Sequence, residues 1–381
     1  FPYRKKIEHF HFKIDRLMRE RRGSNLYKQM CLIIILSVVC FLAACGGYSN
    51  PKQESNETTE GIMGIVDTPV TATPANDDAD TLVLRLGHQS TTDSNYQRAS
   101  LRFKNLVEEK TNGKVRIDIY PFRQLGTDRE LLEAMQFGVL DFGLISNPPV
   151  SGFAPEAAIL DLPFLFKDWE HVKRFLDSEV EEEFRSITED VHLKILSIMA
   201  RGFRHVTTST GPILSTDDFK GTTIRVIESP VYIEAYQALG ASPQSMNFGD
   251  AYTALEQGAI DGQENTMDII DDEKIYEVNS HVSKTGVNFV FGFLMASKDR
   301  FESWPEDVQV AVMEAAEEAV HETNLENEVH EADYEEVLEE KGMEIHEVDR
   351  EQFVPLVENV YKNWIDQYGD DMLNKIQALA E

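Results

Sequence analysis

Short apolar segments alternate with amphipathic segments along residues 81–381. Leu82–Leu86 and Val115–Tyr120 have the apolar, β-branched composition of strands. Each is followed by a segment whose apolar positions have helical spacing, near Tyr96–Lys110 and Asp128–Phe137. This alternation predicts an α/β fold, in which helices cover the faces of a sheet.

A second series of the same kind begins after Gly202. A long helix follows it, opening at Ser303, where Ser303, Pro305 and Glu306 have the pattern of a capping box. The other elements predicted in this series are a strand at Thr223–Ile227, helices at Val231–Leu239 and Asp250–Gln257, and a strand at Val287–Ala296. The folded part has about three hundred residues, more than a single core usually holds, and therefore predicts two domains.

The N-terminal part has the pattern of a secretory signal. Basic residues in Arg19–Lys28 precede Met30–Ala44, an apolar run of about fifteen residues. A membrane-spanning helix needs about twenty. A plausible signal sequence could already begin at Met18. Residues 1–17 are therefore interpreted as the product of a gene start placed too far upstream.

A lipid attachment site is predicted where this run ends. Leu42–Cys45 resembles a lipobox, so residues 1–45 are interpreted as a leader and Cys45 as the lipidated residue. Cys31 and Cys40 would leave with the leader. Residues 46–80 are rich in Ser, Thr, Asn, Pro and Glu, a composition that predicts a flexible tether.

Charge and motifs exclude several classes of function. The net charge of -31 repels nucleic acid, which is therefore not an expected partner. The sequence has no Gly-rich phosphate loop, no GxSxG and no HExxH. His321 and His330 lack metal-ligand spacing. We accordingly predict no enzyme, no cofactor and no metal site.

The most informative segment is Tyr252–Asn265, YTALEQGAIDGQEN, together with Arg225. Its last residues, DGQEN, are predicted to form a turn that presents carboxylate and amide groups. Arg225 lies within the strand predicted at Thr223–Ile227, and its planar guanidinium matches a carboxylate bidentately. From the residues alone, a ligand carboxylate and a structural ion pair are equally good partners for it.

The chain resembles the solute-binding subunits of tripartite ATP-independent periplasmic (TRAP) transporters, the DctP family. Gln-Glu-Asn after Asp-Gly is close to a signature of that family, and further blocks follow in the family's order over roughly residues 80–381. These blocks are LRLGHQ (Leu84–Gln89), LGTDRELLEAMQFGVLDFG (Leu125–Gly143), LDLPFLF (Leu160–Phe166), GFRHVTTS (Gly202–Ser209) and FKGTTIRV (Phe219–Val226).

The resemblance implies a two-domain periplasmic-binding-protein-like fold with a hinge, a ligand cleft and a long C-terminal helix. Carried over, domain I would hold residues 81–201 and 291–330, and domain II residues 202–290 and 331–381. In many relatives a His follows Thr-Gly or Thr-Asn, whereas Val287 follows Thr285-Gly286 here. A hinge network that relies on that His is therefore not expected.

The resemblance also implies the site. Arg225 and Asn265 would hold the substrate carboxylate, with Arg204 as a second arginine and Arg201 as its rival. Phe248 would pack against the ligand. The remaining implied contacts are Gln89, Asp128, Ser146, Asn147 and Glu264. The pattern of the sialic-acid binders is not reproduced at Gln89 and Ser146.

The expected function is capture of an organic acid, either a C4-dicarboxylate or a sugar acid such as a uronate. The loaded receptor, lipid-anchored at the outer face of the cell membrane, would deliver the acid to a permease of a small and a large subunit driven by an ion gradient. A lipoprotein that senses the ligand for a signalling receptor is the alternative. An enzyme acting on uronates would need a base beside Arg225, for which Glu264 is the candidate. Sequence leaves the acid and the oligomeric state open.

Overall fold

One nine-stranded mixed sheet organises the computed structural model, which describes residues 81–380. The leader, the lipidation site at Cys45 and the tether lie outside the described residues. The strands are β1 (Leu82–His88), β2 (Val115–Tyr120), β3 (Phe142–Ser146), β4 (Leu193–Thr208), β5 (Thr223–Val226), β6 (Ser242–Ser245), β7 (Gly262–Asn265), β8 (His281–Ser297) and β9 (Glu344–His346).

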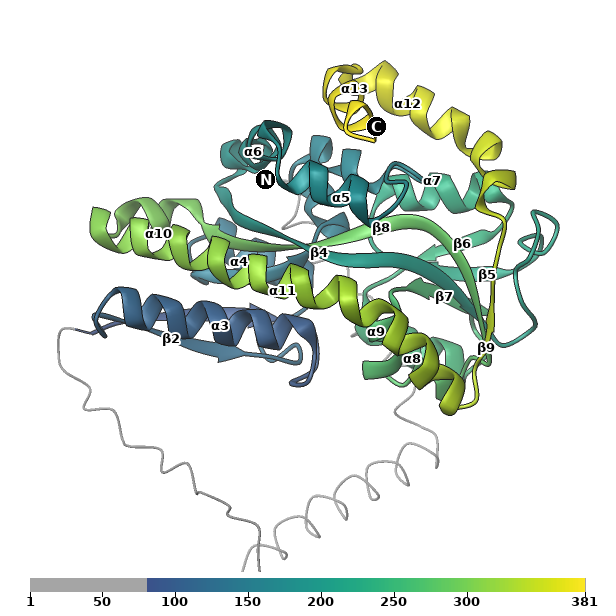
Figure 1. Ribbon diagram of the computed structural model, residues 1–381, viewed down its shortest axis with the longest axis horizontal. Helices are drawn as coiled ribbons and strands as arrows, with labels where there is room; N and C mark the ends of the chain where they lie inside the picture. Colours follow the sequence, from purple (N-terminus) through teal and green to yellow (C-terminus); the bar gives the residue numbers. More distant parts are fainter. Residues whose placement is uncertain (1–80, 381) are drawn as a thin grey trace, which may run out of the picture. The chain divides into compact units, whose positions relative to one another are not determined.

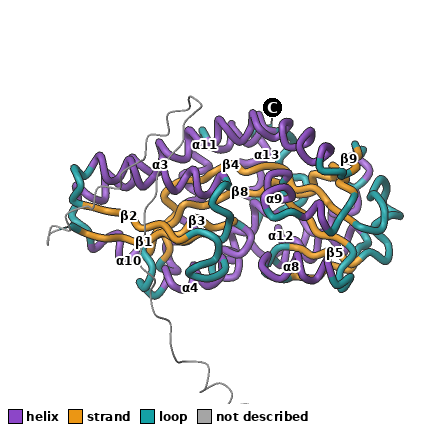
Figure 2. Tube along the Cα trace, turned by 90° about the horizontal axis from the view of Figure 1, so that it is seen from below, coloured by secondary structure: helices purple, strands orange, loops and turns teal. Residues whose placement is uncertain are grey.

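The helices cover the sheet in layers (Figures 1 and 2). They are α3 (Asn95–Lys110), α4 (Asp128–Gln136), α5 (Trp169–Leu176), α6 (Glu179–Arg185), α7 (Pro230–Leu239), α8 (Phe248–Glu256), α9 (Met267–Asp272), α10 (Lys298–Ser303), α11 (Glu306–Glu340), α12 (Glu358–Tyr368) and α13 (Asp371–Ala378). None of the helices between residues 81 and 380 is long and apolar enough to cross a membrane.

The sheet consists of two parallel wings joined by one long antiparallel ribbon. Its strand order is β2-β1-β3-β8-β4-β7-β5-β6, with β9 beside β8. The ribbon is formed by β4 and β8, which pair along most of their length. The wing of β1, β2 and β3 joins the ribbon at the C-terminal end of β8, and the wing of β5, β6 and β7 joins it at the C-terminal end of β4. The two-domain α/β fold expected from sequence is confirmed.

Helix α11 runs along both wings. It is 35 residues long and lies beside α3 over the first wing (Figure 1). Val308, Val312, Ala315 and Ala319 have helical spacing and are buried against the first wing, which accounts for the packing of this half of the helix. Farther along, α11 packs on α9, which follows β7 of the second wing, and on β9, which pairs with β8. One rigid element therefore spans both halves.

The C-terminal helices α12 and α13 also contact residues from both series of elements. Tyr361 donates a hydrogen bond to the Pro163 carbonyl at 2.8 Å, and α12 packs on α7. The predicted domain boundaries stay a prediction. Two predicted boundaries lie between residues 201 and 202 and between residues 290 and 291. Both are next to the register shift between Ala200 and Gly202, where β4 and β8 pass from one wing to the other.

Two local predictions were wrong. Ser303 does not open the long helix, because it is the last residue of α10 and its hydroxyl donates to the Arg300 carbonyl, while Pro305 occupies the N-cap of α11 without a side-chain bond. The DGQEN segment is not a turn, because Gly262–Asn265 forms β7, a central strand between β4 and β5. Its polar side chains find buried partners there.

Candidate ligand-binding site

A pocket lies where two pairs of parallel strands end, β1 with β3 and β5 with β7, and the two pairs run in opposite directions. Gln89 follows β1, Ser146 ends β3, Ile227 follows β5 and Asn265 ends β7. Ligands of open α/β sheets bind at this edge, beyond the carboxyl ends of the strands. The lining comes from both wings and comprises Gln89, Ser90, Ser146, Arg201, Arg204, Arg225, Ile227, Phe248, Asn265, Ile269 and Glu273. Most of the residues predicted to contact the ligand are therefore brought together.

Arg225 is a buried cation of this pocket, and one of its donors has no partner among residues 81–380. Arg225 is 1% exposed, and its Nε and Nη2 donate to the Met246 carbonyl at 3.1 and 2.8 Å. Nη1 has no hydrogen-bond partner among residues 81–380. Burial lowers the pKa of Arg225 to about 10, although the nearby Glu264 carboxylate favours its charge. A buried guanidinium in this state attracts an anion.

Phe248 packs against Arg225. The guanidinium carbon lies 5.3 Å from the centre of the Phe248 ring, within the range of a cation–π contact. Phe248 is the first residue of α8, and Met246, whose carbonyl holds Arg225, precedes it by two residues. The start of α8 therefore fixes both the backbone and the aromatic partner of Arg225.

Arg204 lines the same pocket but is already paired. Its Nε donates to a Glu264 carboxylate oxygen, and its Nη2 donates to the Glu264 carbonyl at 2.7 Å. Burial disfavours the charged form of Arg204, but the Glu264 carboxylate outweighs it and raises the pKa of Arg204. The other oxygen of Glu264 accepts from the Ile227 backbone N–H at 3.0 Å. Glu264 therefore lies behind the lining and not on it.

The first wing contributes amide and hydroxyl groups. Gln89 donates to Asp128 at 2.7 Å, and the same oxygen of Asp128 accepts from the Ser146 backbone at 3.1 Å. Asp128, the first residue of α4, is buried behind Gln89 and does not line the pocket. Burial raises the pKa of Asp128 to about 7. Asn147 also lies off the pocket, because its side chain joins Asp161 and the Phe291 backbone.

Asn265 and Arg201 complete the lining of the second wing and the ribbon. The Asn265 amide donates to Gln263 at 3.3 Å and accepts from the Thr266 backbone at 3.2 Å. Arg201 lies over the Tyr96 ring and donates to Asp268 at 3.4 Å. Both Arg201 and its sequence rival Arg204 thus reach the pocket, and both have carboxylate partners.

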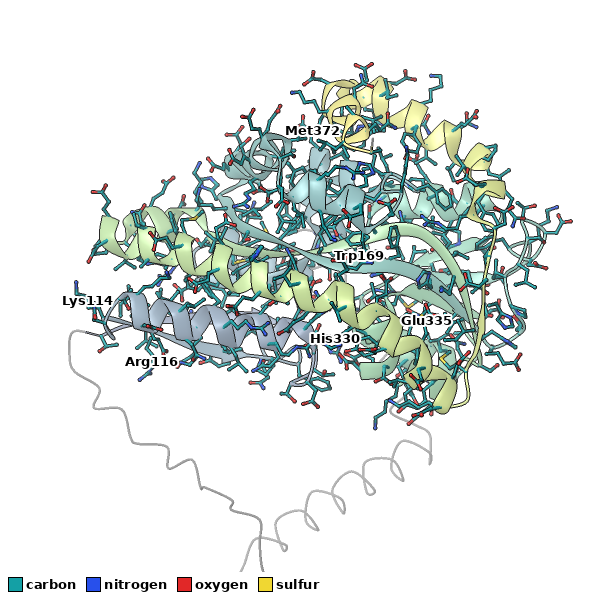
Figure 3. All side chains as sticks on the ribbon, in the orientation of Figure 1. Lys114, Arg116, Trp169, His330, Glu335 and Met372 are labelled. Atoms are coloured by element: carbon teal, nitrogen blue, oxygen red, sulfur yellow. The ribbon has the colours of Figure 1, made fainter. Side chains whose placement is uncertain are left out.

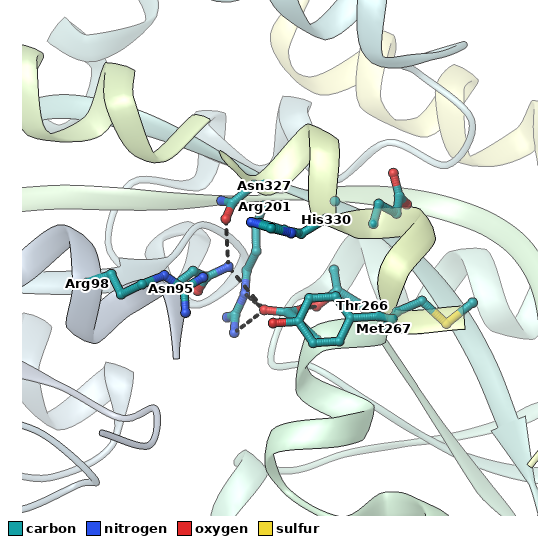
Figure 4. Close-up of a pocket in the computed structure, with 11 residues that line it drawn as sticks. Asn95, Arg98, Arg201, Thr266, Met267, Asn327 and His330 are labelled. Carbon is teal, nitrogen blue, oxygen red and sulfur yellow. Dashed lines mark hydrogen bonds and ion pairs between the residues drawn. The ribbon is translucent and has the colours of Figure 1, made fainter. Parts of the chain in front are cut away.

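A second pocket adjoins the first through Arg201 (Figure 4). Asn95 bridges α3, α9 and α11 there, because its amide donates to Asp268 at 3.0 Å and to Asn327 at 3.4 Å. Trp169 also donates to Glu331 of α11, at the middle of the molecule (Figure 3). The long helix is therefore tied to both wings beside the ligand pocket.

Sequence reasoning missed Asp161, a buried junction between the two series of elements. Its carboxyl oxygens accept from Asn147 and from Ser229, both at 2.7 Å, and its carbonyl accepts from Asn288 at 2.7 Å. Nothing in the block LDLPFLF distinguishes this carboxyl from the many others in the chain. Its importance comes from burial alone.

We expect Asp161 to make stability fall as pH rises. Burial raises the pKa of Asp161 to about 8, above that of the unfolded chain, so the folded state keeps a proton that the unfolded state has lost. This stabilising contribution is complete below the ordinary Asp pKa of about 4 and is lost as pH rises towards 8. Asp161→Asn imitates the neutral carboxyl. Thermal unfolding from pH 5 to 8 should show the melting temperature of the variant increasingly exceeding that of the wild type; a constant difference would contradict the assignment.

The geometry is that of an α/β protein with a pocket between its two wings that is lined by Arg201, Arg204 and Arg225. The comparisons identify the family. Residues 86–367 match the DctP family, bacterial extracellular solute-binding protein, family 7, and the chain belongs to this family. The resemblance seen in the sequence is thereby confirmed. This is a family of solute-binding receptors that act outside the cytoplasm, not a family of enzymes.

Relatives whose ligands are named match 78% of this chain. The 2,3-diketo-L-gulonate-binding periplasmic protein YiaO of Escherichia coli is 29% identical over 303 residues, 78% of this chain and 92% of YiaO. A TRAP solute-binding protein of Polaromonas bound to D-erythronate has 31% identity and a TM-score of 0.76, covering 78% of this chain and 98% of that one. One of Sulfurospirillum deleyianum with bound succinate has 26% identity and a TM-score of 0.74, with 78% and 99% covered.

Proposed function

We propose that this chain is the extracytoplasmic receptor of a TRAP-type transporter and that its ligand is a sugar acid with one carboxylate. Arg225 would hold the carboxylate through Nη1, with Asn265 beside it and Phe248 against the carbon chain. The observation that carries the proposal is the buried Nη1 of Arg225, which has no partner among residues 81–380 and belongs to a lining residue of the pocket.

The charges around the pocket favour a sugar acid over a C4-dicarboxylate. A second ligand carboxylate would need a second available cation, but Arg201 is engaged by Asp268 and Arg204 by Glu264. Glu273, which also lines the pocket, adds a negative charge and pairs with Arg123 at 3.5 Å. Gln89 and Ser146 offer the amide and hydroxyl groups that pair with ligand hydroxyls. Relatives that bind D-erythronate and 2,3-diketo-L-gulonate support this choice.

Capture is proposed to draw the two wings together around the acid, because the lining comes from both. The acid would favour the closed form only to the extent that it binds that form more tightly than the open one. The loaded receptor would then dock on the small and large permease subunits. The chain is proposed to perform no catalysis: Glu264, the base that an enzyme would require, is occupied by Arg204 and by the Ile227 backbone.

A panel of ligands tests the proposal. Aldonates and uronates should raise the melting temperature, because a ligand at one hundred times its dissociation constant adds about 2.7 kcal/mol, or several degrees for a domain of this size. Succinate, malate and neutral sugars are the controls. Binding of dicarboxylates alone would refute the sugar-acid choice, and binding of neutral sugars alone would refute the carboxylate anchor. The acid should be recovered chemically unchanged.

The lipid anchor at Cys45 is part of the same proposal. The sequence Leu42–Cys45, at the end of an apolar run, supports it. In a bacterial host, the full chain should incorporate labelled palmitate and sediment with membranes. Cys45→Ser should lose the label, whereas Cys40→Ser, which changes a cysteine inside the leader, should keep it. Labelling that survives in the Cys45 variant would refute the anchor.

A further inference from the structure

A cluster of two histidines and one glutamate forms where β9 joins β8. The strands are parallel, with His281 opposite Glu344 and Ser283 opposite His346. Residues two apart on a strand point to the same face, so Glu344 and His346 share a face. His281 turns its ring to the same place. The pairing of β8 with β9 thus gathers three side chains that lie far apart in the sequence.

The distances in this cluster match a metal site. Nδ1 of His281 lies 3.2 Å from Nε2 of His346. One Glu344 oxygen lies 3.8 Å from the first nitrogen and 4.0 Å from the second. Ligands of a tetrahedral Zn²⁺ at about 2.0–2.1 Å from the metal lie about 3.3 Å from one another. The two imidazole nitrogens already have this separation, and a rotation of the exposed Glu344 side chain brings its oxygen nearer.

The surroundings favour a cation. The nearest lysine on β8, Lys284, is held by Glu335 at 2.7 Å and by Glu347 at 2.6 Å, so carboxylates balance its charge. Glu335 lies on the C-terminal part of α11 (Figure 3). The chain as a whole carries a net charge of -31. The two histidines are mostly buried, with 17% and 22% of their side chains exposed, which limits their rotation.

We propose that His281, Glu344 and His346 bind a divalent transition-metal ion of the zinc class, with water as the remaining ligand. Imidazole nitrogen suits Zn²⁺, Ni²⁺ and Cu²⁺, whereas Ca²⁺ and Mg²⁺ prefer oxygen ligands. The ion would join β9, and with it the segment that follows α11, to the start of β8. None of the three residues lines the Arg225 pocket, so this site is independent of the proposed ligand.

Titration with Zn²⁺ tests the site. The probe is ZnCl₂, added to the full chain without a polyhistidine tag and with its 3 cysteines alkylated, and followed by calorimetry. We expect one ion per chain and no heat from Ca²⁺. His281→Ala and His346→Ala should each weaken binding by at least about 100-fold, more than the loss of an outer-shell partner costs. Glu344→Gln should weaken it less.

A matched control is His330→Ala. His330 is an exposed histidine that pairs with Asp333 at 2.9 Å, three residues along α11, and its loss should leave the titration unchanged. If a variant fails to fold, anomalous scattering from zinc-soaked crystals of the wild type decides, with one peak expected between His281 and His346. Absence of saturable binding, or tight binding retained in both the His281 and His346 variants, would overturn the proposal.

Discussion

Arg225→Met should abolish sugar-acid binding without unfolding the protein. Removing one partner of a buried charge pair costs about 3–5 kcal/mol, which corresponds to a loss of affinity of at least about 100-fold. The ligand-free variant should be no less stable than the wild type. Burial opposes the charge of Arg225, lowering its pKa to about 10, and an apolar side chain of similar volume removes that cost. Calorimetry gives the affinity and thermal unfolding the stability.

The matched control for this variant is Arg129→Met. Arg129 is an exposed arginine on α4 that pairs with Glu133 at 3.2 Å, and its loss should change neither affinity nor stability appreciably. Affinity within tenfold of the wild type in Arg225→Met would contradict the anchor. If Arg225→Met binds acids and neutral sugars equally weakly, the wild-type preference for acids comes from the contact between Arg225 and the carboxylate.

Site residues could be expected from sequence where a motif marked them. Arg225 and Asn265 belong to blocks that resemble the DctP family, and both reach the pocket. The pairing of Arg204 with Glu264 followed from no pattern, because carboxylates are so numerous that any arginine has many possible partners. The pairing of β4 with β7 places Glu264 beside Arg204, and no local sequence pattern indicates this pairing.

The elements of the fold were predictable to within a few residues where apolar periodicity was clear. Strand β7 was not, because Gln263, Glu264 and Asn265 have the composition of a turn. Tertiary partners outweigh that local preference: Gln263 donates to Thr207 at 3.0 Å, and Glu264 pairs with Arg204. The cluster of His281 and His346 could not be predicted from the sequence either, because it forms only when β8 pairs with β9, which lies far away in the chain.

These partners explain why so polar a segment is buried at the centre of the sheet. The side chains of Gln263, Glu264 and Asn265 all have hydrogen-bond partners, whereas Nη1 of Arg225 has none among residues 81–380. Glu264 balances the charge of Arg204. This division between a paired and an unpaired arginine is the reason for proposing an anion with one carboxylate.

Glu264→Gln should therefore destabilise the fold strongly. Both side chains of the Arg204–Glu264 pair are buried, 2% and 0% exposed, and removing one charge leaves the other uncompensated at a cost of about 3–5 kcal/mol. We expect the melting temperature to fall by roughly 5–10 °C. Thermal unfolding at neutral pH without ligand measures this, with Glu133→Gln, which breaks the exposed pair with Arg129, as the control.

A double variant separates the charge from the shape of Glu264. Adding Arg204→Met to Glu264→Gln removes the uncompensated cation, so most of the lost stability should return, and the two substitutions should be strongly non-additive. Additive losses would mean that the charges of Glu264 and Arg204 do not compensate each other, because a glutamine oxygen still accepts from the Ile227 backbone N–H. In that case Arg204 would not depend on Glu264 for its charge, and it would become available as a second anion-binding group beside Arg225.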